Sequence, residues 1–185
     1  MDRRKPILVN EYEEATDAAL QDAALRSGAR VFPKVRVADA LEINYSGLTD
    51  AEYSYALKAH FDFVVEQAGK PPAFAVEFDG AGHASDVSAI MNDNLKDSIC
   101  EKLGMPLLRI DSGYLRRVGR FTLVGWLAEV WFLGKDFHAA QERGEVSFDE
   151  PFCWSSILGD FDFEKQRFMP PPYDPFVPSR ARILG

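Results

Sequence analysis

The distribution of apolar residues along the chain predicts helices and strands in turn. Residues 11–27 are rich in alanine, leucine and acidic residues, which favour a helix, and Gly28 can end it. Residues 31–37 place valines at 31, 35 and 37, a pattern typical of a strand, and Pro33 favours an edge or the start of that strand. Residues 38–59 are polar and predict a partly helical connection.

The middle of the chain predicts a hairpin, a helix and a further strand. Residues 61–65 and 74–79 are aromatic and β-branched runs separated by glycine and proline, as in a β-hairpin. Residues 86–103 carry apolar side chains every four residues, which indicates a helix. Residues 106–110 predict a third central strand. This order of elements predicts an α/β layer architecture around a mixed sheet.

The last third of the chain has a different pattern. Residues 121–143 predict one or two helices, and their apolar stretch is shorter than the roughly 20 residues that span a membrane. Prolines are dense from residue 160 onward and favour extended structure. We therefore expect one domain, residues 1–159, with its motif-bearing core at 60–111. A proline-rich tail, 160–185, would follow and would either wrap its own domain or dock a protein partner.

Composition and charge narrow the classes of function. Apolar residues make up 46% and charged residues 27% of the chain, as in a folded globular protein. The formal charge is −8, so a phosphate ligand would need a local basic patch or a metal ion. The two cysteines lack zinc-site spacing and indicate reduced thiols. With no apolar signal segment of about 7–15 residues, we expect a cytoplasmic protein that does not enter the membrane.

Carboxylates gather on the predicted hairpin. Asp62 lies among apolar residues of the first strand, and Glu77 and Asp79 share one face of the second because they are two residues apart. If the strands pair, the three carboxylates converge, which is costly without a cation. Hard oxygen ligands suit Mg²⁺ or Mn²⁺. With Lys96 on the following helix, the set is typical of phosphodiester hydrolysis. The alternative is a solvated face of an antiparallel sheet.

A family resemblance rests on these same residues. The string from FDFVV through AVEFDGAGH to NDNLKDSICEKLGMPLLRI resembles the PD-(D/E)XK, restriction-endonuclease-like nuclease superfamily. It is most similar to the very-short-patch repair endonuclease-like branch and to several uncharacterised bacterial domain families. The resemblance covers roughly residues 11–111 and is specific only over about 60–111. It implies a three-layer α/β/α fold with a central mixed β-sheet and metal-dependent cleavage of DNA.

The resemblance assigns roles to the clustered residues. Asp62 and Glu77 match the two acidic metal ligands of the superfamily. Asp79 stands where the superfamily usually has lysine, which is a departure from its pattern. Lys96 matches the position from which related branches supply that lysine. The implied catalytic set is therefore Asp62, Glu77, Asp79 and Lys96, with Asp79 as a further metal ligand or a group that orients water.

Accessory residues are predicted around this set. Glu13 or Glu14 matches a glutamate that the superfamily often carries on its first helix. His83 follows the second strand of the hairpin and is suited to contact phosphate or orient a carboxylate, although a surface loop histidine is equally compatible. Asp93 is a further accessory candidate, its alternative being a charge that suits a helix N-terminus.

One basic cluster offers a place for nucleic acid. Arg116, Arg117 and Arg120 follow the third central strand, and Tyr114 adds an aromatic ring that can stack on a base. Ligands of open α/β sheets bind beyond the carboxyl ends of the strands, which favours this loop. The alternative is a solvated segment that balances nearby acids.

Three functions are compatible with this sequence. The first is a nuclease that uses Mg²⁺ or Mn²⁺ to activate a water molecule against DNA, with RNA less favoured. The second is a catalytically inactive nuclease-fold module that binds nucleic acid or protein. The third is a phosphohydrolase for a small molecule, which would need a closed pocket. Nucleases of this fold often pair to cut both strands, so a homodimer is also compatible.

Overall fold

The structure is a computed structural model whose chain divides into two compact units. These are residues 1–125 and 126–185, and each is described by itself. The residues that the structure describes are 6–8, 10–79, 87–118, 121–152, 161–162 and 167–168.

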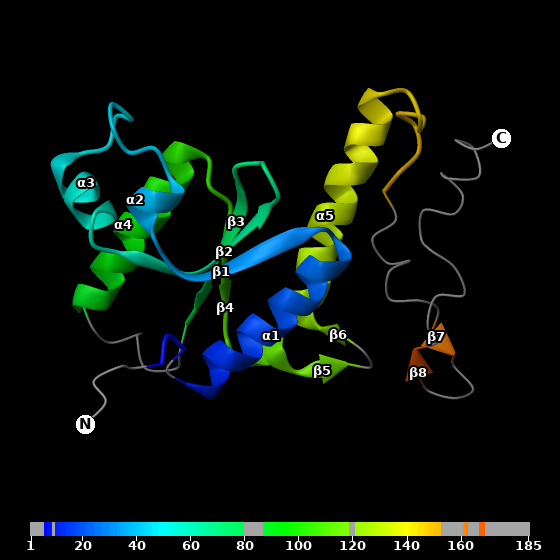
Figure 1. The fold of residues 1–185 in the computed structure, drawn as a ribbon, viewed down its shortest axis with the longest axis horizontal. Coiled ribbons are helices and arrows are strands. Elements are labelled where there is room, and N and C mark those ends of the chain that lie inside the picture. The colour runs from blue at the N-terminus through cyan, green and yellow to red at the C-terminus, as the bar shows by residue number, and fades with distance from the viewer. Residues whose placement is uncertain are drawn as a thin grey trace. The chain divides into compact units, whose positions relative to one another are not determined.

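The first unit is built on a four-stranded mixed sheet (Figure 1). Its strands, in spatial order, are β1 (Ala29–Arg36), β2 (His60–Gln67), β3 (Pro72–Phe78) and β4 (Leu107–Ile110). The β1–β2 and β2–β3 pairs are antiparallel and the β3–β4 pair is parallel. The predicted hairpin and mixed sheet are therefore confirmed, and β1 lies at an edge.

Among the described residues before β4, four helices accompany this sheet. They are α1 (Glu11–Arg26), α2 (Val37–Ala40), α3 (Asp50–Ala56) and α4 (Val87–Leu103). The Asn10 side chain caps α1 by accepting hydrogen bonds from two backbone amides of its first turn. Gly104 follows α4 with a φ of 68°, a left-handed conformation that glycine adopts without strain. Both long helices agree with the sequence pattern, and α2 and α3 lie in the segment expected to be partly helical.

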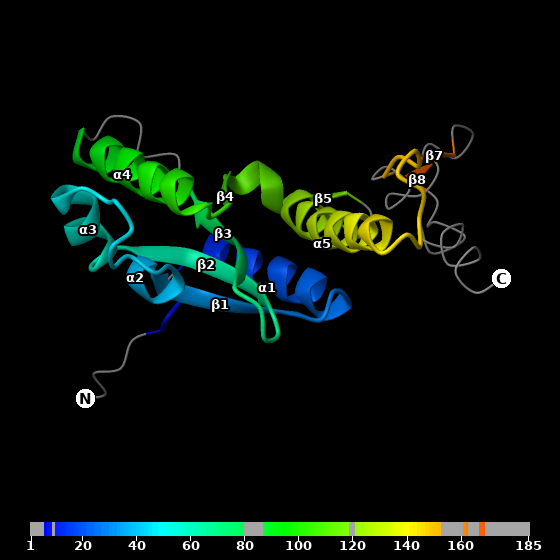
Figure 2. The same ribbon diagram turned by 90° about the horizontal axis from the view of Figure 1, so that it is seen from above.

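Helices cover both faces of the sheet. Ala75 of β3 packs with Phe61 of β2 and with Ile99 of α4 in one core cluster. The next residue, Val76, is also fully buried. Since neighbouring strand residues point to opposite faces, both faces of β3 are covered. The helix α1 runs along β1 and β2, whereas α4 lies across the sheet from it (Figure 2). The protein is thus a mixed α/β protein.

The chain after β4 leads to the second unit. A short 3₁₀ helix, η2 (Ser112–Leu115), is followed by the antiparallel pair β5 (Arg117–Val118) and β6 (Phe121–Thr122). The segment 121–143, expected to form one or two helices, begins with β6 and continues as one long helix, α5 (Leu123–Glu142). No helix in the described part of the chain is long and apolar enough to cross a membrane.

The second unit has a small core of its own. Phe137 and Ala140 of α5 pack with Val146, and Phe152 lies against them. Two short strands, β7 (Phe161–Asp162) and β8 (Arg167–Phe168), pair antiparallel. The rest of the expected tail, and Cys153, lie outside the described residues. The expected domain limits of 1–159 and 160–185 therefore stay predictions.

Candidate functional site

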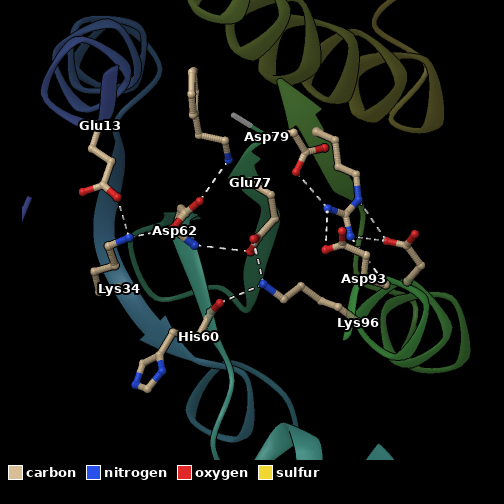
Figure 3. Close-up of polar contacts among 11 residues, drawn as sticks. Glu13, Lys34, His60, Asp62, Glu77, Asp79, Asp93 and Lys96 are labelled. Carbon is tan, nitrogen blue, oxygen red and sulfur yellow. Dashed lines mark hydrogen bonds and ion pairs between the residues drawn. The ribbon is translucent and has the colours of Figure 1, made fainter. Parts of the chain in front are cut away.

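A row of charged residues crosses all four strands of the sheet (Figure 3). The β1–β2 pairs on either side place Lys34 of β1 opposite Asp62 of β2. The β2–β3 pair Phe63–Val76, continued by one residue, places Asp62 opposite Glu77 of β3. Glu77 pairs in turn with Arg109 of β4. The two inner positions are acidic and the two outer positions are basic. The sheet therefore brings together residues that lie far apart in the sequence.

The carboxylates of Asp62 and Glu77 each accept a hydrogen bond from a backbone amide of the neighbouring strand. The Asp62 backbone amide donates a hydrogen bond to Glu77 Oε1 at 3.3 Å. The Phe78 backbone amide donates to Asp62 Oδ2 at 2.9 Å. Glu77 is only 8% exposed, so its carboxylate needs partners to offset the cost of leaving water. The predicted meeting of Asp62 and Glu77 is confirmed.

Lys96 of α4 supplies the partner of Glu77. Its Nζ lies 2.7 Å from Glu77 Oε2 and donates a hydrogen bond to the His60 carbonyl oxygen at 2.9 Å. Lys96 is 6% exposed. Burial raises the pKa of Glu77 above its usual value, and the charge of Lys96 partly opposes that shift. The expectation that Lys96 reaches the carboxylates from the next helix is correct.

Lys34 is a member of the site that the sequence analysis missed. Its Nζ donates to Asp62 Oδ1 at 2.6 Å and to Glu13 Oε1 of α1 at 2.9 Å. Burial lowers its pKa, but the hydrogen bonds that Lys34 donates to these carboxylates, with their negative charge, outweigh burial and raise the pKa overall. The available signal was a charged residue between apolar neighbours in a strand, VFPKV. Of the two glutamates proposed on the first helix, Glu13 reaches the site and Glu14 is exposed.

The backbone of Lys34 is unusual. Its φ of 54° lies in the left-handed region, which residues other than glycine rarely adopt. Such a conformation costs about 1–3 kcal/mol and persists where the surroundings enforce it. Here β1 is paired with β2 on both sides of Lys34, so this conformation occurs without a break in the sheet. The Lys34 side chain reaches Asp62 and Glu13 from this position.

Asp79 does not join the other two carboxylates as expected. Asp79 instead pairs with Arg109, a residue that the sequence analysis also missed. Arg109 Nη1 lies 3.1 Å from Asp79 Oδ1 and 3.2 Å from Asp93 Oδ1. A third carboxylate, Asp97, lies 2.9 Å from Arg109 Nη2. Within the described residues, no three His, Cys, Asp or Glu side chains are arranged to hold a metal ion. The expected convergence of three carboxylates is thus wrong for Asp79.

An acidic cleft of about 1120 Å³ opens over these residues. Of the sequence candidates it is lined by Glu13, Asp62, Glu77, Asp79 and Asp93. Its other described lining residues are Asn10, Tyr12, Phe78, Ala89, Asn92, Asp111, Ser112 and Gly113. The described lining contains no lysine or arginine, since Lys34 and Lys96 contact the carboxylates without lining the cleft.

Of the predicted nucleic-acid residues, Tyr114 lies within η2 and Arg116 and Arg117 follow it. Arg116 and Arg117 are exposed and Tyr114 is half-buried. Arg117 lines a smaller pocket of about 270 Å³ between α1 and β6. The arginines follow Ser112 and Gly113 of the acidic cleft within a few residues. Two other candidates, His83 and Arg120, fall outside the described residues.

Fold and site together define an α/β protein with an open, acid-lined cleft over paired carboxylates and lysines. The family model described as "Protein of unknown function (DUF2726)" matches residues 5–120, and the chain belongs to this family. The match spans every described residue of the site, from Glu13 to Arg109. Comparison with curated proteins and with solved structures found no match.

Proposed function

We propose that this protein is a metal-dependent nuclease that hydrolyses phosphodiester bonds of DNA on a restriction-endonuclease-like fold. One observation carries the proposal: Asp62, Glu77 and Lys96 come from two strands and the next helix and meet beneath an open cleft. An open cleft suits a polymer better than a small molecule. That favours a nuclease over a small-molecule phosphohydrolase.

The donor chemistry of the site fits Mg²⁺ or Mn²⁺. Asp62 and Glu77 both line the cleft, and their oxygens are of the hard kind that these ions select. Mg²⁺ is usually held by one or two carboxylates, with waters and substrate oxygens completing its shell. When bound, the ion would lower the pKa of a water molecule and neutralise phosphate charge. Asp79 would need to leave Arg109 to take part.

The protein's own groups divide the remaining work. Lys96 Nζ, held by Glu77 and the His60 carbonyl, provides a positive charge that can stabilise a negatively charged phosphate oxygen. The Phe78 amide fixes Asp62 in its rotamer, so the carboxylate does not need to reorient when substrate arrives. Arg116 and Arg117 supply contacts for the DNA backbone.

The test is cleavage of supercoiled plasmid and of labelled single-stranded DNA, with Mg²⁺, with Mn²⁺ and with EDTA. We expect metal-dependent cutting that falls more than about 100-fold in Asp62→Asn and in Glu77→Gln, because even outer-shell partners of a metal contribute about 10–100-fold. The control is Glu66→Gln, on the same strand as Asp62 but outside the cleft lining. Full metal-dependent activity in either site variant would refute the proposal.

A second candidate is a catalytically inactive module that binds nucleic acid or protein. The observation in its favour is that Asp62, Glu77 and Asp79 each have a cationic partner within the protein. Such a module does not need to bind Mg²⁺, whereas the nuclease must. A folded protein that cuts no DNA, and that gives no heat of Mg²⁺ binding in calorimetry, would favour this candidate.

A further inference from the structure

Lys34 has no role in the function proposed above, yet it contacts two acidic side chains of the cleft. It bridges Asp62 and Glu13, two residues that line the cleft from β2 and α1. Lys34 itself is about a third exposed and approaches both carboxylates without lining the cleft. Its ammonium group therefore acts on whatever binds there through charge and through the position of Asp62.

The charges of the group around Lys34 and Lys96 show what Lys34 changes. Asp79 and Asp93 also line the cleft, but they pair with Arg109 and lie outside this group. Glu13, Asp62 and Glu77 supply three negative charges, and Lys34 and Lys96 supply two positive ones. The group therefore carries one net negative charge. One divalent cation reverses this to a single positive charge, and one phosphodiester then makes the group neutral. Without Lys34, a divalent cation alone would neutralise the group and leave no positive charge for phosphate.

We propose that Lys34 is a positioning residue that weakens the binding of divalent cations and thereby strengthens the binding of a phosphodiester to the cation-loaded site. The inference rests on the proposed function. A like charge close to a bound cation weakens its binding by Coulomb repulsion, and the same charge attracts phosphate. The left-handed backbone of Lys34 supports the inference, because a strained conformation in an intact strand indicates a requirement for the side chain at that place.

The test measures Mg²⁺ affinity by isothermal titration calorimetry on the full chain at pH 8. We expect Lys34→Met to bind Mg²⁺ about tenfold more tightly, and Glu13→Gln about tenfold more weakly. The double variant, which removes one charge of each sign, should bind like the wild type. Lys34→Arg keeps the charge and should also bind like the wild type. Lys58→Met, an exposed lysine outside the cleft lining, is the matched control.

A second readout follows phosphate. A fluorescent single-stranded oligonucleotide, in saturating Ca²⁺, should bind Lys34→Met several-fold more weakly than the wild type, opposite in direction to the Mg²⁺ result. Thermal unfolding checks that each variant folds, and Lys34→Gln serves as the second neutral variant if Lys34→Met does not fold.

The outcomes separate this inference from the proposed function. If the wild type binds neither Mg²⁺ nor Mn²⁺, both are refuted. If the wild type binds Mg²⁺ but neutral Lys34 variants bind it equally or more weakly, Lys34 is only structural and the nuclease proposal stands. If the double variant binds as weakly as Glu13→Gln alone, Glu13 acts as a direct ligand, which also overturns the inference.

Discussion

At the scale of single residues, the buried pair of Glu77 and Lys96 dominates the electrostatics of the site. Both side chains are at most one-tenth exposed. Removing water from a carboxylate and an ammonium group is costly, and their mutual attraction with further hydrogen bonds offsets that cost. The His60 carbonyl and the Asp62 amide provide those further bonds. Each charge of the pair therefore depends on the other.

Lys96→Met should lower the free energy of unfolding by about 3–5 kcal/mol at pH 7, because it leaves Glu77 buried without a cation. Urea unfolding measures this. The loss should be smaller near pH 4.5. A carboxyl whose folded pKa is raised stabilises the protein most when it is protonated, and that contribution disappears as pH rises through the folded pKa.

The matched control for this prediction is Lys58→Met, whose side chain is exposed. Adding Glu77→Gln to Lys96→Met should recover part of the lost stability, since no buried charge is then left unpaired. Equal stability of Lys96→Met and the wild type at pH 7 would contradict the account of this pair.

The sequence predicts the site unevenly, for a physical reason. Asp62, Glu77 and Lys96 are predictable because strand alternation and one helix determine their positions locally. Lys34 and Arg109 act through contacts 28 and 30 residues away along the chain, to Asp62 and Asp79. Only the register of the sheet and the packing of α4 create those contacts. Periodicity within one element cannot reveal them.

At the scale of elements, the strongly patterned segments were the predictable ones. The long helices and central strands follow from apolar spacing and from turn residues such as Gly69, whose φ is 75°. The short helices α2 and α3 were less distinct in the sequence. The start of α3 depends on a polar side chain, Glu52, and not on apolar spacing. Its Oε2 accepts the Thr49 amide hydrogen bond that begins that helix.

Glu52 also joins α3 to α4. Its Oε1 accepts hydrogen bonds from Ser98 Oγ at 2.6 Å and from Lys102 Nζ at 2.7 Å. The hydrogen bond from Lys102 is the largest of the effects that lower the pKa of Glu52 to about 2. Because the folded pKa is lowered, the stabilisation is present above about pH 4.5 and is lost as pH falls towards 2.

Glu52→Gln should therefore unfold at a lower temperature than the wild type at pH 7, and the difference should shrink as the pH falls from 4.5 to 2.5. Thermal unfolding followed by circular dichroism across this range measures it. Glu101→Gln, an exposed acid on α4, is the control and should show little change at any pH. A difference between Glu52→Gln and the wild type that is independent of pH would contradict the assigned role.

At the scale of the whole molecule, charge is the main constraint on the proposed function. The chain carries a formal charge of −8, and the described lining of its cleft is acidic. Such a protein does not attract DNA at long range, so binding would depend on a bound cation and on few local contacts. We therefore expect modest DNA affinity, with a strong requirement for divalent metal.

Arg116 and Arg117 are the exposed cations nearest in sequence to the cleft-lining residues of η2, so they test this view. In Arg116→Ala/Arg117→Ala, the slope of log affinity against log salt should become shallower by about two, since each arginine that contacts a phosphate contributes about one. Fluorescence anisotropy with labelled duplex DNA in Ca²⁺ measures the slope.

The control is Lys58→Ala/Lys70→Ala, which removes two exposed cations elsewhere in the same unit and should leave the slope unchanged. Mg²⁺ affinity should be unaffected in both double variants, because none of these residues contacts Asp62 or Glu77. If the salt dependence is the same in the wild type and the arginine variant, the phosphate contacts must come from another surface, and the charge argument would then require the bound cation to provide most of the affinity.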